Sequence, residues 1–160
     1  HLFSVESLWQ KDAQTMGLAA ALVAVRVHRK TGEPRVVAGL HLAAPGKVLT
    51  LPLVEGQMEG AWAMGIGHAL LEELPPGADG GADASWNLNR YHVALAGDVA
   101  LHATETVLLP PESPEAPARG MGEVPLNPIA PAVANAIAHA TGRRFRDLPI
   151  TAAKIRAAWS

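Results

Sequence analysis

The spacing of apolar residues changes once along the chain, and this change constrains the fold more than any other feature. Residues 18–27 alternate, with Arg26 on the opposite side from the neighbouring valines. A period of two predicts a half-buried β-strand. A Lys-Thr-Gly-Glu-Pro turn sequence at 30–34 and a second apolar run at 35–42 follow, so the two segments are predicted to form a β-hairpin.

From residue 54 onward the apolar residues recur at helical spacing, as Met58 and Trp62 illustrate, and the pattern stops before Pro75. A helix is therefore predicted over residues 54–74. The remaining predictions are a short strand at 91–95, a strand at 101–109, a helix at 131–141 whose start is marked by either Asn127 or Pro131, and a closing helix at 151–158 capped by Thr151. This order predicts an α+β fold, a two-layer sandwich of a small mixed or antiparallel sheet packed against helices.

Composition excludes several classes of protein. The 160 residues suffice for one domain, and 49% apolar with 18% charged residues is a globular balance. A net charge of −2, with both signs scattered along the chain, gives no basic face for nucleic acid or an anionic membrane. No apolar run reaches the roughly 18 residues that a membrane span needs. Since cysteine is absent, these residues hold no disulfide, thiolate nucleophile or iron–sulfur ligand.

Glycines interrupt the predicted helix at positions 60, 65 and 67. Each costs about 0.8–1 kcal/mol relative to alanine inside a helix, so some compensation is expected. Two explanations stay open, which are tight packing against another helix and close approach of a ligand or another element. A dinucleotide-binding fingerprint is not one of them, because Leu70 stands where a third glycine or alanine belongs.

A second glycine-rich segment, residues 119–125, contains one carboxylate, Glu123. Its glycines allow close packing around whatever Glu123 faces, and the apolar flank at Val124 and Leu126 suits a general base. The alternative is a surface acid favoured by the dipole of the following helix. The seven histidines have no metal-binding spacing, and each is predicted to be a surface residue, so no metal ligand is expected.

These segments, in this order, resemble the molybdenum hydroxylases, the family of xanthine dehydrogenases, aldehyde oxidoreductases and isoquinoline oxidoreductases. The residues that carry the resemblance are 54–60 and 65–73 for a GQxEG…GxGxALxEE helix, 86–91 for an NLxxY segment, 120–125 and 130–142 for a GxGE…APAxANAI…ATG block, and 148–151 for the C-terminal ending. The chain departs from the family at 44–47 and at 51–52, where aspartate-glycine and asparagine-proline pairs are usual.

The resemblance implies a function for three residues. Glu123 would be the general base beside molybdenum, taking a proton from a metal-bound hydroxyl, so that the oxygen added to the product comes from water. Gln57 would contact the pterin of the molybdopterin cofactor, and Gly122 would allow close approach. The substrate would be a small molecule, either an aldehyde or an aromatic N-heterocycle.

The resemblance also implies an organisation. The 160 residues would be a single domain, the C-terminal part of a molybdenum-binding subunit that shares molybdopterin with the remainder of that subunit. Iron–sulfur clusters would lie on a separate subunit or domain, with a flavin or cytochrome protein as a further candidate partner. Alone, the chain is expected to be inactive and metal-free. The alternative is a non-catalytic assembly or docking domain of the same fold, and a cytoplasmic or periplasmic location in a bacterium is left open.

Overall fold

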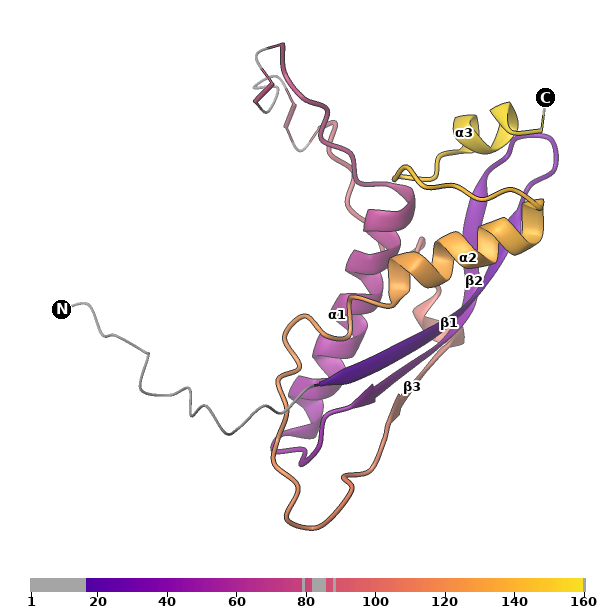
Figure 1. Ribbon diagram of the computed structural model, residues 1–160. Coiled ribbons are helices and arrows are strands. Elements are labelled where there is room, and N and C mark those ends of the chain that lie inside the picture. Colours follow the sequence, from indigo (N-terminus) through magenta and orange to yellow (C-terminus); the bar gives the residue numbers. More distant parts are fainter. Residues whose placement is uncertain (1–16, 79, 82–85, 88, 160) are drawn as a thin grey trace.

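A three-stranded sheet and two helices that pack against it form the body of the molecule (Figure 1). The computed structural model describes residues 17–78, 80, 81, 86, 87 and 89–159. The elements are β1 (Leu18–Val27), β2 (Pro34–Ala44), α1 (Leu51–Leu70), η2 (Leu101–Ala103), β3 (Thr104–Leu108), α2 (Ile129–Thr141) and α3 (Ala152–Ala157). The predicted α+β class is confirmed.

The sheet is mixed. β1 and β2 form the predicted antiparallel hairpin, with a bulge between Ala24 and Val25, and β2 pairs with β3 in parallel. Parallel neighbours need a long connection, and here α1 lies within it. At the hairpin turn, Gly32 has φ +73° and packs so closely on α3 that an added Cβ would lie 2.6 Å from the Ala152 carbonyl oxygen.

Several predicted boundaries need correction. α1 starts at Leu51 rather than 54, because Pro52 is tolerated in a first turn whose N–H groups have no helical acceptor. It ends at Leu70, where the N–H groups of the next two residues both bond the Gly67 carbonyl. The strand predicted at 91–95 is absent, and Leu95 N–H instead donates to the Asp98 carboxylate at 2.9 Å.

The later elements follow the sequence more closely. The strand predicted at 101–109 begins as a single turn of 3-10 helix and is extended only over 104–108. α2 starts at Ile129, between the two predicted starts, with Pro128 rather than Asn127 as its N-cap. It ends at Thr141 and is followed by Gly142 in the left-handed conformation that suits glycine. The Thr151 hydroxyl accepts the Lys154 N–H, as expected of a helix cap.

The main core lies between the sheet and the helices, and Trp62 of α1 is its largest buried side chain. Its indole N–H donates to the Val99 carbonyl at 2.8 Å. The far edge of its ring occupies the space above Gly39 of β2, where an added Cβ would lie 2.1 Å from Cη2. The absence of a side chain at Gly39 therefore leaves room for the edge of the indole ring against the sheet.

The glycines of α1 divide into two groups. An added Cβ on Gly65 would lie 2.5 Å from Cβ of Ile129 in α2, and one on Gly67 would meet the Glu72 side chain. At Gly56 and Gly60 an added Cβ meets nothing within 4 Å. Packing within the chain thus explains Gly65 and Gly67 but leaves the two earlier glycines without a structural reason.

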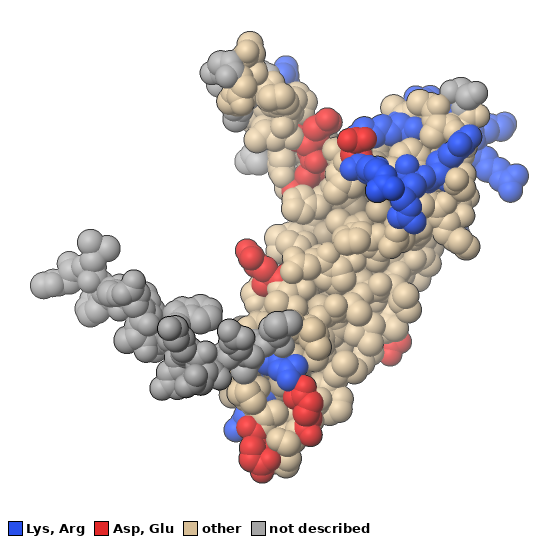
Figure 2. All heavy atoms as spheres, viewed as in Figure 1, with Lys and Arg blue, Asp and Glu red and all other residues tan. Residues whose placement is uncertain are grey.

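Positive charges are more clustered in space than the linear sequence suggests, although several lie elsewhere. They gather at the end of the molecule where the hairpin turn, the C-terminal end of α2 and α3 meet (Figure 2). The Lys and Arg residues of these segments are Arg29, Lys30, Arg143, Arg144, Arg146, Lys154 and Arg156. The segments are far apart in sequence, so only the fold reveals this basic end. In the described part of the chain no helix has the length and apolar character to cross a membrane.

Candidate functional site

Gln57 connects the two glycine-rich segments directly. Its side-chain amide nitrogen lies 3.1 Å from the carbonyl oxygen of Gly122 and 3.4 Å from that of Met121. Both contacts use Nε2, so the amide oxygen is left out of them. The fold therefore joins α1 to the turn that carries Glu123, across 65 residues of sequence.

The turn at 121–126 is stabilised by the packing of a buried side chain and by a hydrogen bond within the turn. Met121 is buried and packs with Met58 and Ala43, while the Leu126 N–H bonds the Glu123 carbonyl at 3.0 Å and leads the chain toward α2. Glu123 itself is exposed, as is Gly122. Of the apolar flank predicted beside the carboxylate, Leu126 packs against the main core instead, and Glu123 lies at the surface of the described part of the chain.

His41 supports this turn from beneath, and the prediction that it is a surface residue is wrong. It is 0% exposed, and its Nε2 lies 2.8 Å from the Pro125 carbonyl oxygen. Burial lowers the pKa of His41, although backbone hydrogen bonds with Pro125 and Met58 oppose the shift. The ring is therefore neutral at pH 7. It packs against Trp62, with ring centroids 5.7 Å apart.

The stretch at 45–47, where the chain departs from the family pattern, is tied by its backbone to residues 117–119. Gly46 pairs with Ala118, and the Arg119 N–H bonds the Pro45 carbonyl at 2.8 Å. Arg119 also pairs with Glu112, and this hydrogen bond holds the pKa of Glu112 below its ordinary value. A cavity of about 270 Å³ lies between these two paired segments and the start of α1, and Met121 lines it.

The middle segment of the resemblance packs on the far end of α1. Tyr91 donates its hydroxyl to the Glu72 carboxylate at 2.5 Å, which raises the pKa of Tyr91, and Trp86 Nε1 donates to the Glu73 carbonyl at 2.9 Å. Gln57 lies about 20 Å from this end at 1.5 Å rise per residue. This segment therefore supports α1 rather than the Glu123 turn.

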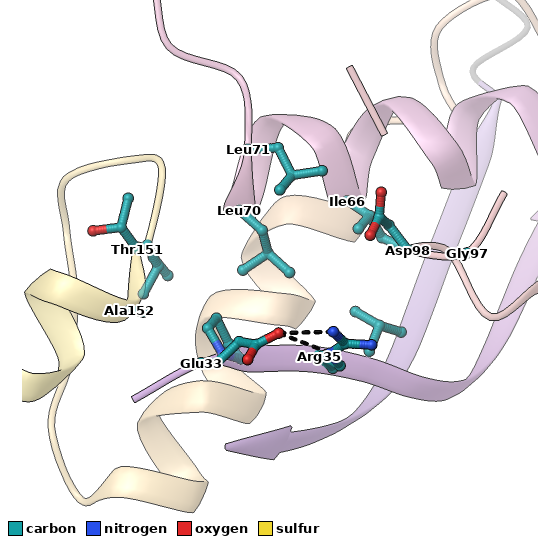
Figure 3. A pocket seen from close by; sticks show the side chains of 12 residues that line it. Glu33, Arg35, Ile66, Leu70, Leu71, Gly97, Asp98, Thr151 and Ala152 are labelled. Atoms are coloured by element: carbon teal, nitrogen blue, oxygen red, sulfur yellow. Dashed lines mark hydrogen bonds and ion pairs between the residues drawn. The ribbon is translucent and has the colours of Figure 1, made fainter. Parts of the chain in front are cut away.

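A second cavity, of about 230 Å³, opens at the hairpin end of the molecule (Figure 3). Residues from the start of β2, the end of α1 and the start of α3 line it, among them Arg35, Leu70 and Thr151. None of Gln57, Gly122 and Glu123 is part of its lining. It is separate from the site that the motifs mark.

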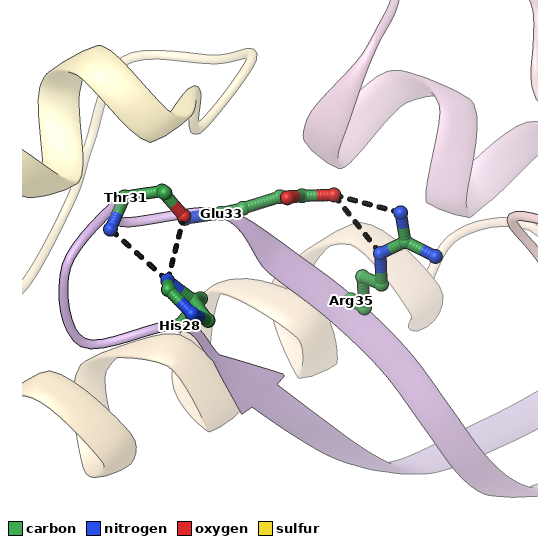
Figure 4. Close-up of polar contacts among 4 residues, drawn as sticks. All are labelled: His28, Thr31, Glu33 and Arg35. Carbon is green, nitrogen blue, oxygen red and sulfur yellow. Dashed lines mark hydrogen bonds and ion pairs between the residues drawn. The ribbon is translucent and has the colours of Figure 1, made fainter.

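The only ion pair that faces this cavity among the described residues joins Glu33 and Arg35, at 2.8 Å (Figure 4). Beside it, the Thr31 N–H and hydroxyl both contact Nδ1 of His28 at the hairpin turn. These contacts satisfy one another and stabilise the turn. In the described ranges no group of three or more His, Asp or Glu side chains could hold a metal ion.

Comparison with known proteins identifies the family of the chain. The family described as molybdopterin cofactor-binding domain matches residues 3–100. The chain belongs to this family. Its members contribute to the molybdenum-binding subunits of the xanthine dehydrogenase and aldehyde oxidoreductase group, as the resemblance implied.

Two relatives of the chain illustrate the match. The aldehyde oxidoreductase molybdenum-binding subunit PaoC of Escherichia coli is 36% identical over 148 residues, which cover 91% of this chain and 20% of that protein. One of the subunits of nicotinate dehydrogenase from Pseudomonas putida is 36% identical over 143 residues, covering 88% and 11%. The chain thus spans about a fifth or less of the length of these relatives.

Solved structures agree with the family. The aldehyde oxidoreductase of Desulfovibrio gigas superimposes with a TM-score of 0.65 at 30% identity, covering 84% of this chain and 14% of that one. Quinoline 2-oxidoreductase of Pseudomonas putida gives 0.68 at 26%, covering 83% and 17%.

The surface beside Gln57 fits the family's cofactor. Gly56 and Gly60 on α1, together with Gly122 in the turn and Gly120 just before it, have nothing within 4 Å of an added Cβ. Because these glycines have no side chain, the backbone near the Gln57 amide is uncovered. A flat polar group such as a pterin therefore has room to approach it closely. Sequence reasoning had identified Gln57, Gly122 and Glu123 but missed His41, whose place in an apolar strand was the only available signal.

Proposed function

We propose that this chain forms the C-terminal part of the molybdenum-binding subunit of a molybdenum hydroxylase and supplies one wall of its active site, with Glu123 as general base. The hydrogen bonds from Gln57 to Met121 and Gly122 carry the proposal, because they join two distant motifs beside an exposed carboxylate. The substrate is an aldehyde or an aromatic N-heterocycle, a class that the names of the two relatives favour.

Each residue has a separate role in this proposal. The cofactor, when bound, supplies two-electron oxidation chemistry with an oxygen atom derived from water. Gln57, whose amide oxygen is not used in the contacts with the turn, would hold the pterin, and Gly122 would let the cofactor approach the backbone. Glu123, held just beyond them, accepts the proton that is released when the oxygen nucleophile forms.

The electrons must then leave through other protein modules. The described chain has no cysteine, so iron–sulfur clusters belong to a separate subunit or domain, with a flavin or cytochrome protein as a further acceptor. The names of relatives as subunits favour such an assembly.

The test replaces Glu123 by Gln in the holoenzyme that contains the chain. Loss of a general base lowers kcat by at least roughly 10²-fold, so that loss is expected while molybdenum content stays unchanged. Glu115→Gln, an exposed acid in the preceding loop, serves as the matched control. Near-normal turnover of Glu123→Gln, or a product whose new oxygen does not come from isotopically labelled water, would reject the proposal.

A docking domain without activity is the second candidate, and one surface favours it. The outer face of β1 exposes Leu18 by 57% and Leu22 by 66%. If the chain only docks, Leu22→Glu blocks assembly, and Glu123→Gln leaves the turnover of the complex unchanged.

A further inference from the structure

His41 has contacts that core packing alone does not explain. It lies in β2, outside both glycine-rich segments, and is fully buried beside Trp62. A carbonyl oxygen can only accept, so the 2.8 Å contact with Pro125 requires the proton to be on Nε2. The other ring nitrogen, Nδ1, is then an acceptor. The Met58 backbone lies near the ring, but within the described ranges Nδ1 makes no hydrogen bond of ordinary geometry.

Burial of this histidine is unfavourable in itself. An unpaired ring nitrogen loses its hydration without compensation, whereas a phenylalanine of similar shape would fill the same space with no such loss. The favourable contribution that histidine adds is the bond from Nε2–H to Pro125, two residues beyond Glu123. The reason for a histidine here therefore lies in the turn.

Side chains from other elements hydrogen-bond the backbone of the turn on both sides of Glu123. Gln57 binds the carbonyls of Met121 and Gly122 just before it, and His41 binds the carbonyl of Pro125 just after it. Because the Glu123 side chain is exposed, its own packing cannot fix its direction. Its position must come from the backbone that these bonds hold.

We propose that His41 is a positioning residue for Glu123, fixing the turn through the Pro125 carbonyl while Gln57 fixes its other side. The proposal rests on the proposed function, in which Glu123 is the base. His41 contacts neither substrate nor cofactor in this scheme. It acts only through the backbone of the turn.

The experiment compares His41→Phe with the wild type in the holoenzyme. The phenylalanine keeps the ring but removes the donor, so kcat is expected to fall roughly tenfold with little change in KM, since a misplacement of about 1 Å can cost about 10²-fold. Hydrogen exchange of the backbone amides in the turn (residues 122–124 and 126, since Pro125 has no N–H) should accelerate while molybdenum content stays constant. His41→Gln, which keeps an N–H donor, should recover part of both losses. His139→Phe, an exposed histidine in the last turn of α2, is the control.

A double mutant separates positioning from general damage. If His41 acts through Glu123, adding His41→Phe to Glu123→Gln causes no further loss of kcat. The same fold loss in both backgrounds overturns the proposal, as do wild-type kcat and exchange in His41→Phe. Should His41→Phe fail to accumulate, His41→Asn, whose amide is too short to reach Pro125, replaces it.

Failure of the proposed function gives a different result. In that case Glu123→Gln keeps its turnover, and the positioning role falls with it. Accelerated exchange at 122–126 in His41→Phe would then still show that the bond to Pro125 holds the turn. Normal exchange together with a loss of turnover in Glu123→Gln would refute the positioning role alone.

Discussion

Gln57 donates a 3.1 Å hydrogen bond to the carbonyl of Gly122, although 65 residues separate them in sequence. Both residues are exposed, so loss of this bond should cost at most about 1.5 kcal/mol of stability. Gln57→Met should therefore unfold nearly as the wild type does but lower holoenzyme kcat several-fold, because the turn loses one of its holds. Gln57→Glu, which places an acceptor against two carbonyls, should be worse. Equal kcat in all three proteins would contradict a role for the contact.

The two groups of glycines in α1 predict opposite effects of alanine. Gly65→Ala forces a Cβ to within 2.5 Å of Ile129 and should lower the free energy of unfolding by about 1–3 kcal/mol. Gly60→Ala meets open space and should raise it by about 0.8–1 kcal/mol through better helix propensity. Urea denaturation of the chain measures both. The same sign for the two variants would contradict the packing described for α1 and α2.

Acid should destabilise the fold through His41. Its pKa is lowered by burial, so below about pH 6.5 the unfolded chain binds a proton that the folded chain resists. This contribution to stability is complete above about pH 6.5 and is lost as the pH falls toward the lowered value. Denaturant midpoints between about pH 7.5 and about pH 5 should decline for the wild type. The decline should be shallower for His41→Phe, and parallel curves would exclude His41 as its source.

The contact between Gly39 and Trp62 gives a fourth prediction. Gly39→Ala puts a methyl group 2.1 Å from the indole ring and should cost about 1–3 kcal/mol, or more if the ring cannot move. In a Trp62→Leu background the same substitution should cost much less, because the obstructing ring is gone. A double-mutant cycle in urea tests this, and additive effects would show that the clash is not the cause.

Much of the fold was predictable from periodicity. The alternating residues of β1, the apolar run of β2, the Thr151 cap and the Gly142 stop each follow from local rules that tertiary contacts did not override. The strand predicted at 91–95 failed, because a short apolar run cannot reveal a side-chain contact such as that from Leu95 to Asp98. The parallel pairing of β2 with β3 could not be predicted either, since the order of strands in a sheet depends on the whole chain.

The candidate site was predictable only in part. Resemblance identified Gln57 and Glu123, but their link through Met121 and Gly122 is a long-range contact. His41 was predicted to lie at the surface, because the sequence pattern of a strand does not show how deeply each of its side chains is buried. Its partner Pro125 lies 84 residues away, so no local rule could pair them.

The long sequence separation between the Glu123 turn and the residues that hold it has a kinetic consequence. The hydrogen bonds from Gln57 and His41 join the Glu123 turn to residues made at least 64 positions earlier, and the connection between them must close first. Contacts of such high sequence separation form slowly, because loop-closure entropy precedes any gain. During synthesis the hairpin and α1 can therefore assemble well before the turn does, and its geometry is among the last features of the nascent chain to mature.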